Sequence, residues 1–516
     1  MHDLLDTLWP PALHTWLGNT ARLIGELWQA IPGQVWLGLY AAWVIGSVIF
    51  MLMQRRRPTA TLAWIIAFFS LPLIGAIVYF FFGPRKLRRR KFGRELAKLL
   101  AARMAPEQSQ PMPATLASRL WLTSLARLAT SYGEAPPRPS QSVRLFADGD
   151  STYEAIEAAM RAAQHQIHLE YYIYEPDEIG TRWRDLLIER ARAGVAVRVL
   201  VDALGSKNCG RRFWQPLRKA GGRVRVFNPP RFLKLQPSLI NFRSHRKIVV
   251  VDGLTAFTGG INVTVGSSMA SSGGAAWRDT HMALTGAPAL DLQLVFLEDW
   301  LYAGSRRGPA TAFDFQDATA QDIEEWFPAP PAQADGPWVQ ILTSGPDEAV
   351  PSIHRYFFTA ISLARRRIWL TTPYFVPDEP MMTALATARA RGVDVRILLP
   401  RRGDSWVVSA AASTFADEIV RENVAVFEYT ARMIHAKSIV IDDELAIVGT
   451  ANIDNRSFRL NFEVVVAIYD AGVTAELAAM FSQDLAHAEQ LRAEDGKTPF
   501  VERLLASAVR LAAPLL

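Results

Sequence analysis

The hydrophobic pattern at the start of the chain predicts membrane segments. No charged residue occurs within residues 31–54 or 58–84, and each stretch exceeds the roughly 20 residues that a helix needs to cross a bilayer. We therefore expect two membrane segments within residues 31–84. Pro72 and Gly75 interrupt the second stretch, so one alternative is that this segment does not cross fully. A pair of buried helices in a soluble core is the other alternative.

Beyond residue 140 the pattern of apolar and polar positions occurs twice. A helix pattern followed by an apolar strand spans residues 151–174 and again residues 351–375. A glycine stop and a second apolar strand follow in each copy, in the sequences ARAGVAVRVLVD and RARGVDVRILLP. Helices that alternate with buried strands indicate an α/β architecture with parallel strands. We expect two tandem α/β domains, residues 141–304 and 337–516, which pack as a pseudo-dimer.

The segments outside these domains are assigned from composition and periodicity. Residues 305–336 contain the stretch PAPPAQADGP and little periodicity, so we interpret them as a linker. Residues 85–140 form a basic juxtamembrane segment and a connector with a helix over 115–130. Residues 1–30 are an N-terminal extension with tryptophans among leucines, either an interfacial helix or a poorly ordered tail. Residues 499–516 have helical spacing, which favours packing on the second domain over membrane contact.

The charge of the chain is concentrated next to the apolar stretches. Residues 85–103 hold nine Lys/Arg and one Glu, and Arg55, Arg56 and Arg57 add three more positive charges. Together they exceed the net charge of +6, so the rest of the chain is net acidic. This distribution argues against a nucleic-acid-binding surface and favours attraction of anionic lipid headgroups to the basic segment.

Two further features of the composition bear on location. Because the cluster at residues 85–91 is the larger one, the positive-inside rule places it and the following domains in the cytoplasm. Cys209 is the one cysteine of the chain, so no internal disulfide framework is possible. We interpret this cysteine as structural or incidental.

One motif occurs at the same place in both copies of the repeat. The spacing His-x-Lys-x4-Asp, with Gly and Asn at offsets 14 and 17 from the histidine, is found twice. The first copy is His245, Lys247, Asp252, Gly259 and Asn262, and the second is His435, Lys437, Asp442, Gly449 and Asn452. Agreement at five positions within a wider repeat makes chance a poor explanation.

The spacing of the motif predicts where its side chains lie. Residues at i and i+2 share one face of a strand, so the histidine and lysine project together. The Asp-Gly and Asp-Asp pairs that follow are typical of hairpin turns, and the returning strand brings the asparagine back beside the histidine. Two facing halves then supply two imidazoles, two ammonium groups and two amides, a set that suits a phosphodiester. No cluster with metal-ligand spacing accompanies them, so we expect neither a metal nor another cofactor.

The doubled motif resembles the phospholipase D superfamily, and within it the bacterial cardiolipin synthases that have two N-terminal membrane segments. The resemblance covers nearly the whole chain after residue 30. Three stretches resemble that family in particular: RRRPTATLAWIIAFFSLPLIGAIVYFFFG in the membrane segments, WRDTH at 277–281 and NIDNRSFRLNFEV at 452–464. Ser244 departs from the pattern, because Asn, Asp or Met is common before the first histidine.

The resemblance implies a double displacement on phosphatidylglycerol. One molecule is attacked at phosphorus, releases glycerol and leaves a phosphatidyl-histidine; the hydroxyl of a second molecule then displaces the histidine and gives cardiolipin. By analogy His245 is the nucleophile and His435 the general acid and then base, although the sequence itself is symmetric. The groups implied to bind the phosphate are Lys247, Lys437, Asn262 and Asn452.

The acidic residues near the motifs have a different expected role. Asp252 and Asp442 complete the two catalytic motifs but do not share the strand face of the histidines, so we expect a structural or orienting role. Glu463 and Asp279 are candidates for orienting a histidine across the domain interface. Surface or strand-end carboxylates are the alternative for both. His281, within WRDTH, is the remaining histidine that we expect near the site.

The expected partners are phosphatidylglycerol, other anionic phospholipids and the membrane, with no nucleic acid. The resemblance implies a multi-pass protein of the bacterial inner membrane with cytoplasmic catalytic domains. Residues 229–242 mix apolar and basic side chains and either contact the bilayer or pack on the domain. The rival functions are a phospholipase D hydrolase or nuclease, a phosphatidyltransferase that uses another donor or alcohol, and an inactive membrane-bound scaffold.

Overall fold

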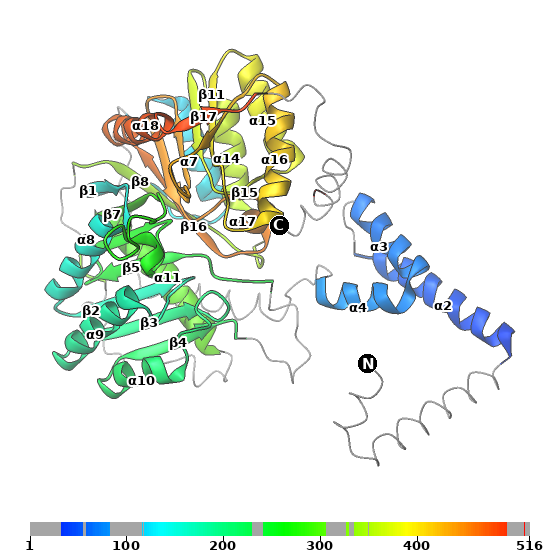
Figure 1. Ribbon diagram of the computed structural model, residues 1–516, viewed down its shortest axis with the longest axis horizontal. Helices are drawn as coiled ribbons and strands as arrows, with labels where there is room; N and C mark the ends of the chain where they lie inside the picture. The colour runs from blue at the N-terminus through cyan, green and yellow to red at the C-terminus, as the bar shows by residue number, and fades with distance from the viewer. Residues whose placement is uncertain are drawn as a thin grey trace. The chain divides into compact units, whose positions relative to one another are not determined.

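The computed structural model describes the chain in two compact units, residues Met1–Arg85 and Lys86–Leu516, which are treated separately (Figure 1). The described residues are 32–54, 58–82, 116, 118–229, 241–305, 327–329, 335–348, 350–492 and 510. Several predictions therefore lie outside the described residues. These are the 1–30 extension, the basic cluster at 85–103, most of the 305–336 linker, the helix at 499–516 and most of the segment 229–242.

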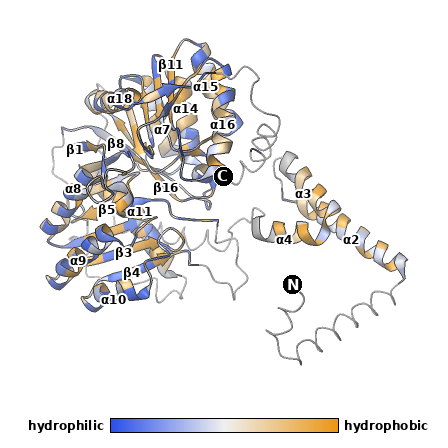
Figure 2. Ribbon diagram, in the orientation of Figure 1, coloured by the Kyte–Doolittle hydropathy of each residue, from blue (hydrophilic) through white to orange (hydrophobic). Residues whose placement is uncertain are grey.

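The first unit contains one helix long and apolar enough to cross a membrane, as far as the described residues go. Helix α2 (Gly33–Leu52) has 20 residues and a mean hydropathy of 2.0. The second apolar stretch forms two shorter helices, α3 (Pro58–Ser70) and α4 (Pro72–Phe82), because Pro72 disfavours helical geometry at the preceding residue. This break matches the alternative in which the second stretch does not cross fully. Figure 2 shows apolar residues along all three helices.

The second unit is built on one continuous sheet that runs through both halves of the repeat. Within the described residues it has 15 strands in the order β17-β12-β11-β9-β13-β14-β16-β8-β1-β7-β6-β5-β2-β3-β4. The strands of the first half are β1 (Arg138–Phe146), β2 (Gln166–Tyr171), β3 (Ala196–Asp202), β4 (Arg223–Phe227), β5 (Lys247–Val251), β6 (Thr255–Gly259) and β7 (His281–Gly286). Those of the second half are β8 (Trp338–Ser344), β9 (Arg367–Thr371), β11 (Asp394–Pro400), β12 (Ala425–Tyr429), β13 (Ser438–Ile441), β14 (Leu445–Gly449), β16 (Glu463–Tyr469) and β17 (Ala488–Gln490). A separate pair joins β10 (Phe375–Val376) to β15 (Ile453–Asp454).

The strand order has a pseudo-twofold centre between β1 and β8. Outward from it, the order β1-β7-β6-β5-β2-β3-β4 matches β8-β16-β14-β13-β9-β11-β12. The two halves join where Pro139 pairs with Trp338. Strands β2, β3 and β4 are parallel, as are β9, β11 and β12. The other pairings in the sheet are antiparallel. Two of them, β5–β6 and β13–β14, are the hairpins predicted at Asp252 and Asp442. The tandem α/β architecture is confirmed, with a mixed sheet.

Helices cover both faces of the sheet (Figure 1). Successive side chains of β5 point to opposite faces of the sheet. Val249 belongs to the core beneath the first-half helices, and Ile248 belongs to a core shared by both halves. In the second half Ile439 and Val440 divide in the same way. The first-half helices are α8 (Gly149–Ala162), α9 (Glu178–Arg192), α10 (Arg211–Lys219), the 3-10 helix η3 (Val265–Ser267) and α11 (Ala287–Ser305). Those of the second half are α14 (Ser352–Leu363), α15 (Glu379–Ala390), α16 (Trp406–Arg421), α17 (Asn455–Arg459) and α18 (Ala471–Leu485).

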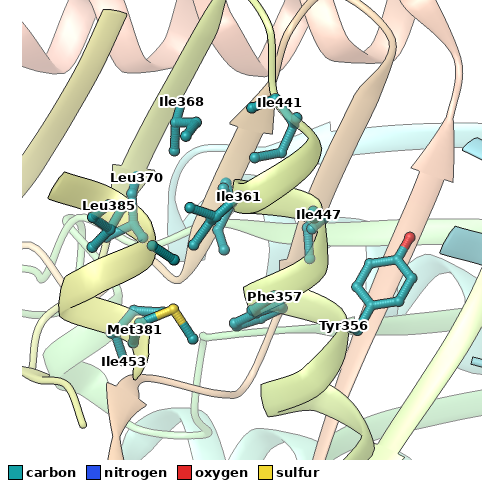
Figure 3. Close-up of a cluster of buried hydrophobic side chains, with 14 of the residues drawn as sticks. Tyr356, Phe357, Ile361, Ile368, Leu370, Met381, Leu385, Ile441, Ile447 and Ile453 are labelled. Carbon is teal, nitrogen blue, oxygen red and sulfur yellow. The ribbon is translucent and has the colours of Figure 1, made fainter. Parts of the chain in front are cut away.

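The largest core lies in the second half and includes the predicted connector helix. Figure 3 shows Phe357 and Ile361 of α14 packed with Leu370 of β9. Helix α7 (Leu120–Ser131) contributes Leu122, Leu125 and Ala129 to the same cluster. The Gln340 amide also donates to the carbonyl oxygen of Ala135, at 2.9 Å, just beyond this helix. The connector is thus part of the second half of the fold.

Candidate active site

Each histidine of the doubled motif is held by the opposite half of the chain. His245 comes just before β5, and its backbone N–H donates to the carbonyl oxygen of Phe462 at 2.9 Å. His435 comes before β13, and its backbone N–H donates to the carbonyl oxygen of Arg278 at 2.6 Å. Both imidazoles are buried. The site therefore forms at the junction of the two halves, as the facing repeats predict.

A carboxylate from the opposite half binds the Nδ1 atom of each imidazole. The Nδ1 of His245 lies 2.9 Å from Oε2 of Glu463, and the Nδ1 of His435 lies 2.6 Å from Oδ2 of Asp279. The Thr450 hydroxyl donates to the same Glu463 oxygen at 2.6 Å, which fixes the carboxylate. Because the carboxylate accepts the Nδ1–H proton, the lone pair of a neutral imidazole stays on Nε2. The predicted contact of Glu463 and Asp279 with a histidine across the interface is present.

The two lysines lie beside their histidines with their ammonium groups buried. Lys247 donates from Nζ to the backbone oxygen of His245 at 2.8 Å. Lys437 donates to the backbone oxygen of His435, and its Nζ lies 3.0 Å from Nδ1 of the same histidine. Burial lowers the pKa of Lys247 to about 7 and that of Lys437 to about 8. Lys437 also lowers the pKa of Lys247, so the positive charges of the two halves converge on one place.

Burial and the paired carboxylates set the protonation of the histidines. Desolvation lowers the pKa of His245, and Glu463 opposes this shift. Desolvation and Lys437 lower the pKa of His435 to about 4, and Asp279 opposes them. Burial raises the pKa of each carboxyl, but the nearby lysine and histidine charges outweigh it and hold the pKa of Asp279 and of Glu463 below the usual values. At neutral pH these shifts favour neutral imidazoles and ionised carboxylates.

The two asparagines of the motif are buried behind the returning strands. Asn262 follows β6 and Asn452 follows β14, and the two side chains are almost inaccessible to solvent. The Oδ1 atom of each has no hydrogen-bond partner among the described residues. Buried amides with unused bonding capacity are unfavourable unless a ligand or water satisfies them. This observation is compatible with the predicted contact to substrate.

Asp252 and Asp442 lie at the far ends of β5 and β13. Since a strand rises about 3.3 Å per residue, the five residue steps from Lys247 to Asp252 separate them by roughly 16 Å. The Asp252 carboxylate accepts the backbone N–H groups of residues 164, 165 and 166, each at 2.8 Å. Asp442 accepts those of residues 365, 366 and 367 at 2.7–3.1 Å. These contacts correspond to the structural role expected for the third member of each motif.

Other residues near the histidines escaped the sequence analysis. The Tyr172 ring packs edge-on against His245 with 5.0 Å between ring centres, and the Trp277 ring lies 5.1 Å from that of His435. The Thr450 carbonyl oxygen is 3.1 Å from Nδ1 of His245. Trp277 opens the WRDTH stretch, which was the available clue for it, whereas Tyr172, just after β2, belongs to no motif and had no signal in the sequence. Thr450 directly follows Gly449 of the second motif, and that position was the available clue.

His281, which we expected near the site, is fully buried opposite Gly259 in the sheet. Within the part of the chain that the structure describes, neither ring nitrogen has a hydrogen-bond partner. Burial lowers its pKa to about 3, with Lys247 and Asp279 close enough to act on it. The corresponding position beside Gly449 is Val465. The two halves of the site are therefore not equivalent at this position.

Arg246 anchors the first motif from the opposite face of the strand. Its guanidinium is fully buried, donates to the backbone oxygen of Glu463 at 3.1 Å and pairs with the Asp299 carboxylate. This arrangement holds the backbone of the residue whose side chain binds His245. In the second motif Ala436 occupies the corresponding position, so this anchor exists in the first half alone among the described residues.

Tandem α/β halves that bring two His/Lys pairs together across a pseudo-twofold centre define an enzyme of the phospholipase D type. Comparison with known families agrees. The family model described as "Cardiolipin synthase, PLD-like domain" matches residues 156–272 and 357–485. The model described as "Phospholipase_D-nuclease N-terminal" matches residues 39–84.

Similar proteins of known family extend over nearly the whole chain. Cardiolipin synthase 1 of Bacillus cereus is 34% identical over 483 residues, which are 93% of each chain. The cardiolipin synthase of Geobacillus kaustophilus is 35% identical over 519 residues, covering 96% of this chain and 100% of that protein. The chain belongs to the cardiolipin synthase family of the phospholipase D superfamily and is a phosphatidyltransferase of that family.

A solved structure supports the fold assignment. Phosphatidylserine synthase of Haemophilus influenzae Rd KW20 superposes with a TM-score of 0.58 and 15% sequence identity. The match covers 76% of this chain and 100% of that one. At this identity the likeness concerns the arrangement of helices and strands.

Proposed function

We propose that the protein joins two phosphatidylglycerol molecules into cardiolipin and glycerol through a phosphatidyl-histidine intermediate. The observation that carries this proposal is the crossed pairing of His245 with Glu463 and of His435 with Asp279. Each imidazole has Nδ1 bound to a carboxylate, which leaves Nε2 to attack or to transfer a proton. Membership of the cardiolipin synthase family supports the substrate class.

In the first step His245 acts as the nucleophile. Its Nε2 forms a bond to phosphorus while the bond from phosphorus to the glycerol oxygen breaks, and protonated His435 gives its proton to that oxygen. The Lys437 ammonium beside Nδ1 of His435 makes the protonated ring a stronger acid, which suits this role. The Glu463 carboxylate stabilises the positive charge that His245 gains.

In the second step His435 acts as the base and His245 is the leaving group. His435 accepts the proton from a hydroxyl group of the second phosphatidylglycerol, and the resulting oxygen forms a bond to phosphorus. The bond from phosphorus to Nε2 of His245 breaks and restores the free enzyme. The atoms and charges balance, since one glycerol leaves for each cardiolipin formed.

The phosphate binds to positively charged side chains, and its binding favours their protonated forms. Burial favours the neutral form of Lys247 and Lys437 in the empty site. An anionic phosphodiester raises the pKa of both lysines and of His435, because an adjacent opposite charge favours the protonated form. Substrate binding thus shifts both lysines further toward their charged form and favours the protonated His435 that the first step needs. Asn262 and Asn452 complete the phosphate contacts in this account.

Product analysis of the reconstituted protein tests the proposal. Full-length protein is placed in phosphatidylglycerol vesicles without added metal, and lipids and released glycerol are quantified. We expect one glycerol per cardiolipin, lost in His245→Ala and in His435→Ala but kept in His165→Ala, which changes an exposed histidine. Phosphatidic acid as the main product would identify a hydrolase. Turnover that required another donor or alcohol would identify a different phosphatidyltransferase.

We infer further that the catalytic unit faces the cytoplasm and that the protein is multi-pass, because the larger basic cluster follows the second apolar stretch. A single cysteine at exposed Leu120, in a Cys209→Ser background, reports this orientation. An impermeant thiol reagent should label it in inverted membrane vesicles and not in spheroplasts. The opposite labelling would reverse the orientation.

A further inference from the structure

Two loops of the second unit flank the catalytic histidines at equivalent places in the two halves. The first mouth loop, residues 203–212, follows β3 and includes the first two residues of α10. The second mouth loop, residues 401–406, follows β11 and ends at the first residue of α16. Strands β3 and β11 correspond in the pseudo-twofold order of the sheet. Their carboxyl ends point to the edge at which the two motifs begin, because β2 and β9 pair in parallel with them and antiparallel with β5 and β13.

The first mouth loop contacts residues that touch His245. Its Ser206 hydroxyl donates to the carbonyl oxygen of Tyr172 at 2.8 Å, and the Tyr172 ring packs on His245. Asp202, at the end of β3, accepts the backbone N–H of Leu204 at 2.8 Å and that of Ser244 at 3.1 Å. The loop is thus tied directly to the entrance of the first catalytic motif.

The second mouth loop is tied to the same opening from the other half. The Tyr374 hydroxyl donates to the Asp404 carboxylate at 2.6 Å. Asp404 is close enough to raise the pKa of Lys437. Tyr172 of the first half is among the groups that raise the pKa of Tyr374, after burial and Asp404. Each half of the chain therefore places one of these loops at the edge of the sheet where the motifs begin.

Both loops expose an apolar residue together with basic ones. Leu204 is 47% exposed and Trp406, at the start of α16, is 74% exposed. Single exposed apolar residues are common on soluble proteins, but here they occupy corresponding loops beside the site. Exposed basic residues accompany them: Lys207, Arg211, Arg212 and Arg402. The aromatic, aliphatic and basic side chains match the interface of an anionic bilayer.

We propose that the two mouth loops dock on an anionic lipid bilayer, with Trp406 and Leu204 inserted at the headgroup level and the basic residues on the phosphates. This inference rests on the proposed function, in which both substrates are lipids of the membrane. Docking at two points seals the entrance against the bilayer, so a headgroup reaches the histidines while its acyl chains stay in the membrane. Exclusion of water at this seal favours transfer to an alcohol over hydrolysis.

The chain provides a matched control at the opposite edge of the sheet. Leu120 is 78% exposed, close to the 74% of Trp406, and lines a cavity of about 420 Å³ with Asp442 and Asp443. That cavity lies at the far end of β13 from Lys437. A bilayer held by the mouth loops leaves Leu120 in water.

A site-specific fluorescent probe tests the docking directly. Full-length protein in a Cys209→Ser background receives Trp406→Cys, Leu204→Cys or Leu120→Cys, and each cysteine is labelled with an environment-sensitive dye. In vesicles of phosphatidylglycerol and phosphatidylcholine we expect blue-shifted emission, quenched by brominated lipid, at positions 406 and 204 but not at 120. Aqueous emission at 406 and 204, equal to that at 120, would overturn the proposal whether or not the protein makes cardiolipin.

Turnover measurements separate this inference from the proposed function. Trp406→Ser combined with Leu204→Ser should reduce cardiolipin formation on vesicles about tenfold, which corresponds to losing about 1.4 kcal/mol of interfacial binding. The same variant should match the wild type on phosphatidylglycerol dispersed in detergent micelles, and Leu120→Ser should match it on both. Unchanged turnover on vesicles would overturn the docking and leave the proposed function intact. Absence of cardiolipin from the wild type would contradict the proposed function, and the probe would still decide the docking.

Discussion

At the scale of single residues, the two carboxylates that bind the imidazoles control the chemistry of the site. Asp279 opposes the effect of burial on His435, and Glu463 opposes it on His245. Removing either carboxylate therefore lowers the pKa of its histidine. The consequence differs, because the proposed acid must be protonated whereas the nucleophile must be neutral.

Asp279→Asn should lower turnover roughly 10²–10⁴-fold and move the alkaline limb of the pH profile to lower pH. A lower pKa of His435 means that the acid loses its proton at a lower pH than in the wild type. The profile of kcat, measured on phosphatidylglycerol in micelles, checks the direction. Movement of this limb to higher pH would contradict the assigned role of His435.

Glu463→Gln should lower turnover by a similar factor, but it should displace the acidic limb of the pH profile instead of the alkaline limb. The nucleophile His245 then stays neutral to a lower pH, so the acidic limb of the profile moves to lower pH. Running both variants in one assay makes each the control for the other. Identical displacement of the same limb in both variants would show that the two histidines do not have distinct roles.

The sequence predicts most of these residues but not their neighbours. The repeated spacing identifies His245, Lys247, His435 and Lys437, and the resemblance adds the two carboxylates as candidates. Thr450 and Tyr172 reach His245 through tertiary packing across the sheet. Contacts of this kind depend on strand order and register, which no local pattern of residues encodes.

At the scale of elements, the hairpin turn after each motif depends on its aspartate. Asp252 and Asp442 have positive backbone φ angles of 49° and 52° and accept three backbone N–H groups each. Replacing either aspartate by alanine should reduce the stability of the fold, because alanine provides no acceptor for these N–H groups and tolerates positive φ poorly. The aspartate of the motif thus joins the hairpin to the preceding helix-to-strand turn.

Asp442→Ala should destabilise the fold by roughly 2–4 kcal/mol while the activity of the remaining folded protein is kept. Thermal unfolding of the purified protein, with turnover normalised to folded protein, checks both parts. Asp443→Ala is the matched control, because its exposed ion pairs with Arg366 and Arg367 contribute about 1 kcal/mol or less. Loss of turnover without loss of stability would assign Asp442 to the chemistry instead.

The sequence predicts helices and strands well where the apolar positions have a strong periodicity. It predicts them less well where composition and backbone geometry favour different structures. The paired helices and strands of both halves are found as expected, and so are the two hairpin turns. The apolar stretch at 58–84 is uniformly hydrophobic, yet it divides at Leu71 because the geometry around Pro72 overrides composition. The expected parallel sheet is mixed because the hairpins place antiparallel strands between its parallel groups.

At the scale of the whole molecule, the site exists because two halves face each other. The carboxylate of each triad-like contact comes from the half that does not supply the histidine. The repeat in the sequence predicts this pseudo-dimer, but the continuous sheet through β1 and β8 depends on pairings between residues some 200 positions apart. The partnership of helix α7 with the second half also escaped prediction, since an amphipathic helix does not specify which core it joins.

The molecule should work without a metal ion, because Lys247 and Lys437 supply the positive charge for the phosphate. Excess EDTA should leave cardiolipin formation within experimental error of the untreated enzyme. Magnesium chelated by EDTA in equal amount controls for ionic strength. Loss of turnover that added Mg²⁺ or Zn²⁺ restores would contradict this expectation.

Capture of the covalent intermediate would show directly whether His245 carries the phosphatidyl group. Reconstituted protein is mixed with phosphatidylglycerol labelled at phosphorus, denatured within one turnover at neutral pH, and digested for mass spectrometry. The account predicts a phosphatidyl group on the peptide that contains His245, absent from His245→Ala. A protein that forms cardiolipin without any labelled histidine, or with the label on His435, would contradict it.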